Sequence, residues 1–270
     1  MWDATNYAAK DNLLRVVRRE AEQMFVMAEA PEAWGASTAC PQWRVGDIVG
    51  HLIDVTESYF VGFDAARGGS AAPDALGLRD MAQLLDEGAR SHRPLSQQEA
   101  LDRLRGDFAK FMELCEGLGP DDWGGLVVTH KYMGPLPAFF YPTFQLMDYA
   151  VHSWDIRQGS GRAHGLDGDA ADLLVPFMFI LWQATAAPPP DAVPAEIGIR
   201  VTSGHNAGAW RVSAGPDGMA YQPGDVEDLP ATLEFDPGSM VLTAFGRSNS
   251  GTIRGDGAVA DRFLNLFFRI

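Results

Sequence analysis

The sequence predicts an α plus α+β protein: an N-terminal antiparallel four-helix bundle followed by a smaller α+β domain. Apolar residues recur at helical spacing through the first part of the chain. A proline-rich segment at residues 187–194 then interrupts the pattern, and short alternating stretches follow it. We therefore expect residues 1–186 to form the bundle and residues 187–270 the second domain. With 270 residues, 46% of them apolar, the chain can form two cores.

Four long amphipathic segments supply the helices of the expected bundle. Residues 6–28 and 45–67 carry apolar side chains three or four positions apart. A third helix is expected over residues 96–116, because its Ser-Gln-Gln-Glu start is a capping box. A fourth begins at one of the prolines near residue 140 and ends at a glycine, residue 159. The segment between the second and third helices is predicted to be a long connection.

The remaining elements belong to the end of the chain. A fifth helix, almost wholly apolar, is expected over residues 169–186, packed on the bundle or on the second domain. Asp236-Pro237 is typical of a helix start and predicts a helix through Phe245. Short stretches bounded by Gly, Pro and Asp predict strands at residues 196–203, 209–214, 219–222, 231–235 and 252–254, and a last helix at 259–268.

Charge and composition exclude several classes of protein. The chain has 36 acidic and 21 basic residues, a net charge of −15, which opposes binding to a phosphate backbone. Its longest apolar run, residues 173–182, is too short to span a bilayer. Residues 1–12 lack the pattern of a secretion signal, and the two cysteines, Cys40 and Cys115, form no disulfide framework. We expect a cytoplasmic protein with no nucleic-acid or membrane partner, in which both cysteines are buried apolar residues.

A carboxylate and an imidazole share one face of the predicted fourth helix. Asp148 and His152 are four residues apart, so their side chains project one turn apart, on the face that also carries Phe144 and Val151. That face is apolar and is expected to point inward. A buried carboxylate without a partner costs several kcal/mol, roughly, and a metal ion would satisfy both groups at once. A simple ion pair between Asp148 and His152 is the alternative.

A third ligand is expected from the second helix. His51 follows Ile48 by three residues and precedes Val55 by four, which places it on the inward seam of that helix. Helical bundles build metal sites from facing helices in this way. Two imidazoles and one carboxylate suit catalytic zinc, and equally the facial triad of non-haem iron. The alternative for His51 alone is a core histidine with a hydrogen-bonded partner.

Two segments resemble one family of metalloenzymes. Residues 43–54 read W-R-V-G-D-I-V-G-H-L-I-D, and residues 144–161 read F-Q-L-M-D-Y-A-V-H-S-W-D-I-R-Q-G-S-G. These are similar to the second and fourth helices of DinB-like metalloenzymes, above all the mycothiol-dependent maleylpyruvate isomerase branch. A-T-L-E-F-D-P-G-S-M-V-L-T-A-F-G-R and G-T-I-R-G-D-G-A-V-A-D-R-F-L-N-L-F resemble the small sterol-carrier-like domain of that family.

The resemblance implies a divalent metal, zinc in our expectation, held by His51, Asp148 and His152. The family more commonly has Glu where this chain has Asp148. Because Asp is one methylene shorter, the backbone must approach the metal or a water must bridge, and Gln145 could assist. Asp155, three residues after His152, could accept the N–H of a metal-bound imidazole. Its alternative is an exposed carboxylate near a helix end.

The C-terminal domain of the family carries a functional arginine that meets an anionic substrate. Gly246-Arg247 is the match in this chain, and Arg254 is its rival. The alternative for Arg247 is a cation that complements a helix dipole. The remaining histidines lie in presumed loops and are predicted to be surface residues; they are His92, His130, His164 and His205.

These implications lead to one expected function and two alternatives. The first is a mycothiol-dependent isomerase or thiol S-transferase for a small, electrophilic, anionic substrate, in which the metal lowers the pKa of the thiol. The second is a thiol-independent metal-dependent hydrolase or non-haem iron oxygenase. The third is a ligand-binding protein without catalysis. The partners are then a small-molecule substrate and a low-molecular-weight thiol, and the protein is expected to be a monomer or homodimer.

Overall fold

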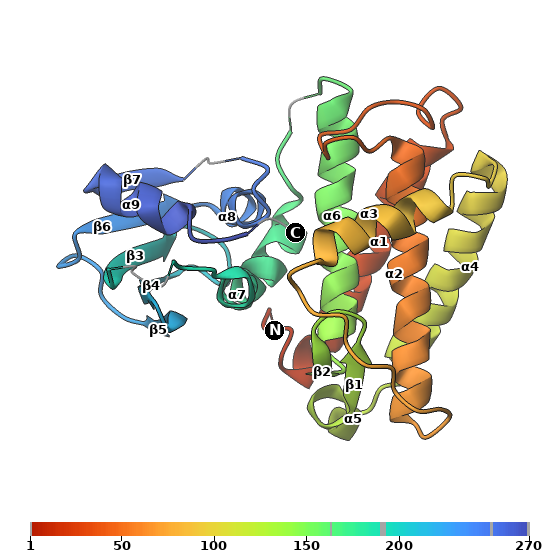
Figure 1. Ribbon diagram of the computed structural model, residues 1–270, viewed down its shortest axis with the longest axis horizontal. Helices are drawn as coiled ribbons and strands as arrows, with labels where there is room; N and C mark the ends of the chain where they lie inside the picture. Colours follow the sequence, from red (N-terminus) through yellow and green to blue (C-terminus); the bar gives the residue numbers. More distant parts are fainter. Residues whose placement is uncertain (1, 163, 190–192, 249–250, 269–270) are drawn as a thin grey trace. The chain divides into compact units, whose positions relative to one another are not determined.

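The computed structural model describes residues 2–162, 164–189, 193–248 and 251–268, and it divides the chain into two compact units (Figure 1). The first unit, Met1–Leu166, is mainly helical, and the second, Asp167–Ile270, is a mixed α+β unit. The predicted fold class is therefore confirmed. Residues 190–192 of the proline-rich segment lie outside the described residues. No helix in the described ranges is long and apolar enough to cross a membrane.

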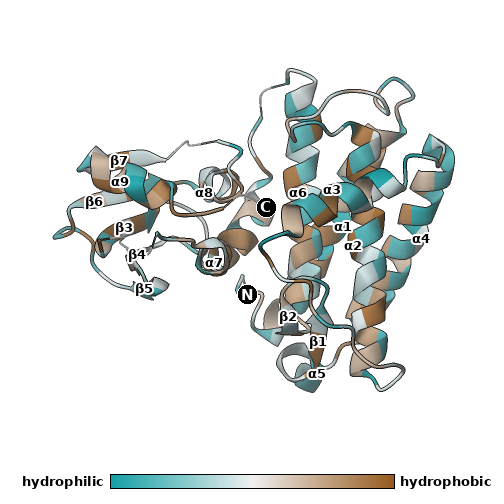
Figure 2. Cartoon of the chain, viewed as in Figure 1, coloured by the Kyte–Doolittle hydropathy of each residue, from teal (hydrophilic) through white to brown (hydrophobic). Residues whose placement is uncertain are grey.

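Four long helices form the bundle of the first unit. They are α1 (Lys10–Glu29), α2 (Val45–Ala66), α4 (Gln97–Glu116) and α6 (Phe140–Gly159), and a single 3-10 turn, η1 (Tyr7–Ala9), precedes α1. α1 packs on α6 and α2 packs on α4. The predicted capping box starts α4: the Ser96 hydroxyl accepts from the backbone N–H of Glu99, whose carboxylate accepts from the Ser96 N–H. Figure 2 shows how apolar and polar residues are mixed along these helices.

The connection between the second and third predicted helices contains a helix that the sequence did not predict. α3 (Met81–Ser91) runs across α2 (Figure 1) and buries only Met81 and Ala89, too sparse a pattern to predict a core helix. It can approach closely because α2 has Gly50 at the crossing, where an added Cβ would lie 2.4 Å from the Ala89 carbonyl oxygen. Between Arg67 and Met81 the connection has no helix or strand, and residues 67–77 are exposed.

A hairpin and a short helix, also unpredicted, complete the first unit. β1 (Val127–His130) and β2 (Gly134–Pro137) pair antiparallel after α5 (Pro120–Gly125). β1 packs on α2 at a second interior glycine, Gly62, where an added Cβ would lie 2.6 Å from the carbonyl oxygen of Thr129. Gly50 and Gly62 therefore mark two places where another backbone comes close to α2.

In its described residues, the second unit is a five-stranded sheet with three helices. Its strands are β3 (Ala195–Val201), β4 (Gly208–Gly215), β5 (Gly218–Pro223), β6 (Ala231–Phe235) and β7 (Thr252–Gly255), in the order β5-β4-β3-β6-β7. β3 and β6 are parallel and the other pairs antiparallel. The helices are α7 (Gly168–Thr185), α8 (Pro237–Ala244) and α9 (Gly257–Leu264). Asp236 caps α8 as predicted, accepting from the backbone N–H of Ser239.

The division between the units falls earlier than the sequence predicted. The expected boundary lay between residues 186 and 187, whereas the structure divides the chain between Leu166 and Asp167 and gives α7 to the second unit. α7 packs on α8 and β5, and its buried Trp182 contacts the rings of Phe235 and Phe263. The apolar character of α7 therefore reflects burial against the sheet domain.

Candidate metal centre

The three predicted ligands lie together inside the bundle. His51 comes from α2, and Asp148 and His152 come from α6. One ligand atom from each lies within 4.8 Å of the others. The His51 Nε2 atom is 3.7 Å from Asp148 Oδ1, and the two imidazole rings meet edge to face with centroids 5.1 Å apart. Both histidines are buried, whereas the Asp148 side chain is 21% exposed. The carboxylate is thus the member of the group that reaches solvent.

The lack of hydrogen bonds from the described residues to the His51 ring is compatible with a cation bound between His51, Asp148 and His152. Its Nε2 is too far from Asp148 for a hydrogen bond, and its buried Nδ1 has no hydrogen-bond partner among the described residues. A buried imidazole normally satisfies its donor and acceptor nitrogens. A divalent metal between His51, Asp148 and His152 would take the lone pair of one imidazole nitrogen from each histidine and neutralise the carboxylate.

Asp155 fixes the orientation of His152. The His152 Nδ1 and Asp155 Oδ2 atoms are 2.9 Å apart, and the carboxylate is fully buried. This is the contact that the sequence predicted, and the alternative of an exposed Asp155 is wrong. Burial lowers the pKa of His152 although Asp155 opposes the change, so the imidazole is neutral near pH 7. A carboxylate acceptor puts the proton on Nδ1 and leaves the Nε2 lone pair free for a metal.

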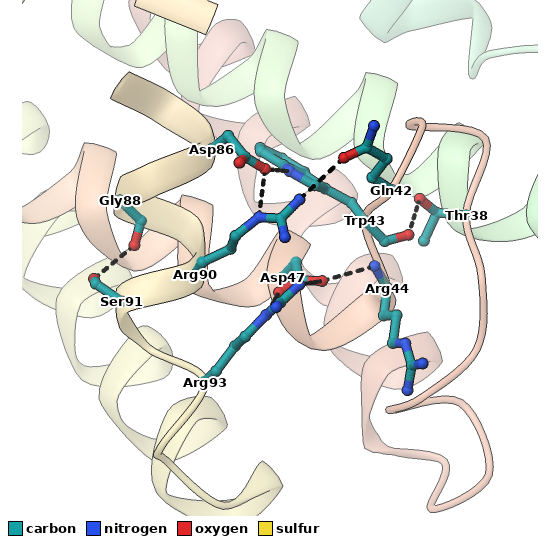
Figure 3. A network of polar contacts seen from close by, with 10 residues as sticks. All are labelled: Thr38, Gln42, Trp43, Arg44, Asp47, Asp86, Gly88, Arg90, Ser91 and Arg93. Atoms are coloured by element: carbon teal, nitrogen blue, oxygen red, sulfur yellow. Dashed lines mark hydrogen bonds and ion pairs between the residues drawn. The ribbon is translucent and has the colours of Figure 1, made fainter. Parts of the chain in front are cut away.

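An indole ring covers one side of the two imidazoles. The ring centroid of Trp43 lies 5.2 Å from that of His51 and 5.8 Å from that of His152. Its Nε1 donates a 2.8 Å hydrogen bond to Asp86 on α3, and Arg90 donates to the same carboxylate oxygen at 2.8 Å (Figure 3). α3 therefore holds the side chain that packs on both candidate ligands.

A second carboxylate joins α3 to the start of α2. Asp47 accepts from the backbone N–H of Arg44 at 3.0 Å and from Arg93 Nε at 2.7 Å (Figure 3). The bond from Arg93, which follows α3, competes with the burial of Asp47 and leaves the pKa of this carboxyl below its usual value. This network was not predictable from the sequence, because α3 itself was not predicted.

Gln145 lies on α6, three residues before Asp148. Its side chain is fully buried on α6, and its Nε2 donates a 3.0 Å hydrogen bond to the Thr56 hydroxyl on α2. The amide oxygen has no hydrogen-bond partner within the described part of the chain. Gln145 therefore links the two helices that carry the candidate ligands.

His130 is not the surface residue that the sequence predicted. It ends β1, and its ring is in contact with the rings of Tyr59, Tyr141 and Phe144. Burial lowers the pKa of His130 to about 4, against an opposing effect of the Asp148 carboxylate. The local sequence shows two short strands with glycine and proline, and nothing in it indicates that the hairpin folds against α2 and α6.

The other predicted residues occupy varied environments. Of the remaining presumed surface histidines, His205 is exposed, whereas His92 and His164 are half-buried. Cys115 is buried as predicted, and Cys40 is only half-buried.

Arg247 follows α8 and donates to the carbonyl oxygen of Phe245 at 3.2 Å. Arg254 on β7 donates to a carboxylate oxygen of Glu234 at 2.8 Å.

Fold and site together define a two-unit protein whose helical bundle carries a His-Asp-His group of metal-ligand type, in which both histidines are buried. The family model for the mycothiol maleylpyruvate isomerase N-terminal domain matches residues 17–157, more than half of the chain. This protein belongs to the mycothiol-dependent maleylpyruvate isomerase family. Among curated proteins, none matches the chain significantly.

Solved structures agree with the family assignment at the level of the fold. A crystal structure of the mycothiol-dependent maleylpyruvate isomerase has a TM-score of 0.59 and 12% sequence identity, covering 90% of this chain and 91% of that one. A variant of the same enzyme with one histidine replaced by alanine gives a TM-score of 0.61 at the same identity and coverage. The shared architecture therefore includes both units.

Proposed function

We propose that this protein is a mycothiol-dependent metalloenzyme that isomerises a small, anionic, electrophilic substrate, with a divalent metal held by His51, Asp148 and His152. The observation that carries the proposal is the convergence of these three side chains from α2 and α6, with ligand atoms within 4.8 Å of one another. Membership of the family supports the isomerase and its thiol. S-transfer is the related activity that the same site would support.

Two imidazoles and one carboxylate suit catalytic zinc, as they also suit non-haem iron, and we propose zinc. Three protein ligands would leave such an ion a position for a small molecule. When bound, the metal would supply a Lewis-acidic position that lowers the pKa of a thiol and makes thiolate available near neutral pH. Chemistry with a free thiol suits a reducing compartment, so we propose that the protein is cytoplasmic.

The chain's own residues orient and enclose this site. Asp155 keeps the proton of His152 on Nδ1, so that Nε2 stays available as a ligand. Trp43 packs on both imidazoles and keeps water from that side of them. Asp148 is the partly exposed member, so a small substrate would approach beside it. We further propose Arg247 as the cation that binds the substrate's anionic group, since arginine holds a carboxylate with two parallel bonds.

The test combines elemental analysis with a thiol-dependent assay. Purified protein should contain about one zinc per chain and should convert maleylpyruvate to its trans isomer only when mycothiol is present. In cobalt-substituted protein, mycothiol should produce a sulfur-to-cobalt charge-transfer band. The metal-free protein and the reaction without thiol are the controls. Turnover without any thiol, or a cobalt spectrum unchanged by millimolar mycothiol, would contradict the proposal.

A further inference from the structure

The backbone of the β1–β2 turn fixes the proton of His130. The Nδ1 atom of His130 accepts hydrogen bonds from the backbone N–H groups of Tyr132 and Met133, each at 3.2 Å. A ring nitrogen that accepts N–H groups carries no proton. In the neutral imidazole, the proton of His130 therefore resides on Nε2.

His130 lies beside the seam between α2 and α6 that holds the candidate ligands. Its ring centroid is 5.9 Å from that of Tyr59 on α2 and 5.1 Å from that of Phe144 on α6. Phe144 precedes Asp148 by one helical turn on the same face of α6. The Asp148 carboxylate also influences the ionisation of His130, so the two side chains lie within electrostatic reach.

His130 and His152 have opposite tautomers and hence opposite capabilities. Asp155 holds the proton of His152 on Nδ1 and frees the Nε2 lone pair. The backbone does the reverse to His130: its Nε2 has a hydrogen and no lone pair, so it donates and cannot ligate a metal. Because the two ring nitrogens lie on different edges, the Nε2–H of His130 points away from the hairpin turn.

We propose that His130 is a substrate-binding residue whose Nε2–H donates a hydrogen bond to an anionic or carbonyl oxygen of the small electrophile bound beside Asp148. This inference rests on the function proposed above. A donor with a fixed proton stabilises negative charge on oxygen without giving that proton up. It also adds no charge next to the candidate metal ligands.

Two substitutions distinguish the roles of the two ring nitrogens of His130. His130→Asn keeps an acceptor oxygen where Nδ1 meets the turn and removes the Nε2–H. His130→Gln extends an amide donor toward the place of Nε2. Maleate, a cis dicarboxylate, is the probe, and its binding to the metal-loaded protein is measured by calorimetry. Metal content and the thermal unfolding midpoint are recorded for each variant, and His92→Asn, at the end of α3, is the matched control.

We expect His130→Asn to weaken maleate binding about tenfold or more, the effect of one lost bond to a charged oxygen. Metal content should not change, His130→Gln should regain part of the affinity, and His92→Asn should bind like wild type. The inference is overturned if wild type does not bind maleate, if His130→Asn binds it equally well, or if that variant loses its metal. Maleate binding that depends on His130, without thiol-dependent turnover, would refute the proposed function and leave this role of His130 standing.

Discussion

The Nδ1 atom of His152 and the Oδ2 atom of Asp155 are 2.9 Å apart in the interior of α6, one turn apart along the helix. The carboxylate is fully buried and can only accept, so the bond sets both the proton and the rotation of the imidazole. One side chain of the bundle core therefore determines which nitrogen His152 presents to His51 and Asp148.

Replacement of this carboxylate tests that relationship. Asp155→Asn can still accept from Nδ1–H, but it loses the negative charge that makes the imidazole a stronger donor to a metal. We expect zinc affinity to fall about tenfold to a hundredfold, measured by competition with a chromophoric chelator. Asp102→Asn on α4, an exposed position, is the control and should match wild type. An unchanged affinity in Asp155→Asn would show that the bond is structural only.

The three proposed ligands should differ in their tolerance of substitution. His51→Ala and His152→Ala should each empty the site and keep the helical circular dichroism, because each removes one of two imidazoles. Asp148→Glu should retain metal, since Glu reaches further, whereas Asp148→Ala should bind it more weakly. Metal is measured by elemental analysis after dialysis. Full metal in both alanine variants of the histidines would refute the site, and wild-type affinity in Asp148→Ala would remove Asp148 from it.

Trp43 should contribute to both stability and metal binding. Although burial favours the neutral form of Asp86, hydrogen bonds from Arg90 and Trp43 hold its pKa below its ordinary value. Trp43→Phe removes the Nε1 donor and keeps a ring on the imidazoles, so it should cost about 1 kcal/mol of unfolding free energy and leave metal affinity nearly unchanged. Trp43→Ala should also weaken metal binding. Urea unfolding measures the effect on stability, and chelator competition measures the effect on metal binding. Equal metal affinity in wild type, Trp43→Phe and Trp43→Ala would contradict a role of the Trp43 ring in metal binding.

A carboxyl far from the candidate ligands in sequence should make stability depend on pH. Burial, with help from Glu57, raises the pKa of Asp107 from 3.8 to about 6. A raised pKa means that the folded state prefers the protonated form, so this stabilisation is complete below pH 3.8 and is lost as pH rises through about 6.

Asp107→Asn, which resembles the protonated carboxyl, should therefore stabilise the protein at pH 8 and have little effect at pH 4. We expect a gain on the order of 1 kcal/mol at pH 8, because the side chain keeps partial access to solvent. Urea unfolding at the two pH values measures it, with Asp102→Asn on the same helix as the control. A destabilised variant at pH 8 would show that the charged form of Asp107 is favoured in the fold.

Replacing Arg247 should impair catalysis, whereas replacing Arg254 should not. Arg254 forms an ion pair with Glu234, so its replacement should have little effect on turnover. Arg247→Ala should raise KM for an anionic substrate, and Arg247→Lys should recover only part of the loss, since lysine keeps the charge without the planar fork. Steady-state kinetics at equal metal content make the comparison. If Arg254→Ala is the impaired variant, the assignment of the functional arginine moves to β7.

The elements that carry the candidate ligands were predictable because they are long and rich in apolar residues. The spacing of apolar residues along α2 predicted the position of His51. α6 buries nearly every residue from Phe140 to Ile156, and the four-residue spacing of Asp148 and His152 predicted that the two lie one turn apart. α3 and the β1–β2 hairpin were not predicted, since α3 buries few side chains and the two strands are four residues long. The contact of Asp86 with Trp43 and the placement of His130 were therefore not predicted either.

One sequence signal for those elements was available. Gly50 and Gly62 stand in the interior of α2, where glycine destabilises a helix relative to alanine by about 1 kcal/mol. Each is accounted for by a neighbouring backbone, the Ala89 carbonyl at Gly50 and the Thr129 carbonyl at Gly62. An interior glycine is not a specific signal of this kind, because an added Cβ at Gly106, inside α4, would lie within 4 Å of no other segment of the described residues.

The exposed connection between α2 and α3 also defines where this protein tolerates added sequence. Residues 70–74 are exposed and lie outside any helix or strand, whereas Leu76 and Gly77 are bonded to the backbone of the β1–β2 hairpin. Lengthening such a loop costs little free energy, because loop-closure entropy grows slowly with length. A fluorophore-labelling tag or a small inserted domain at residues 70–74 should therefore leave α3, and the indole that it holds on the two histidines, undisturbed.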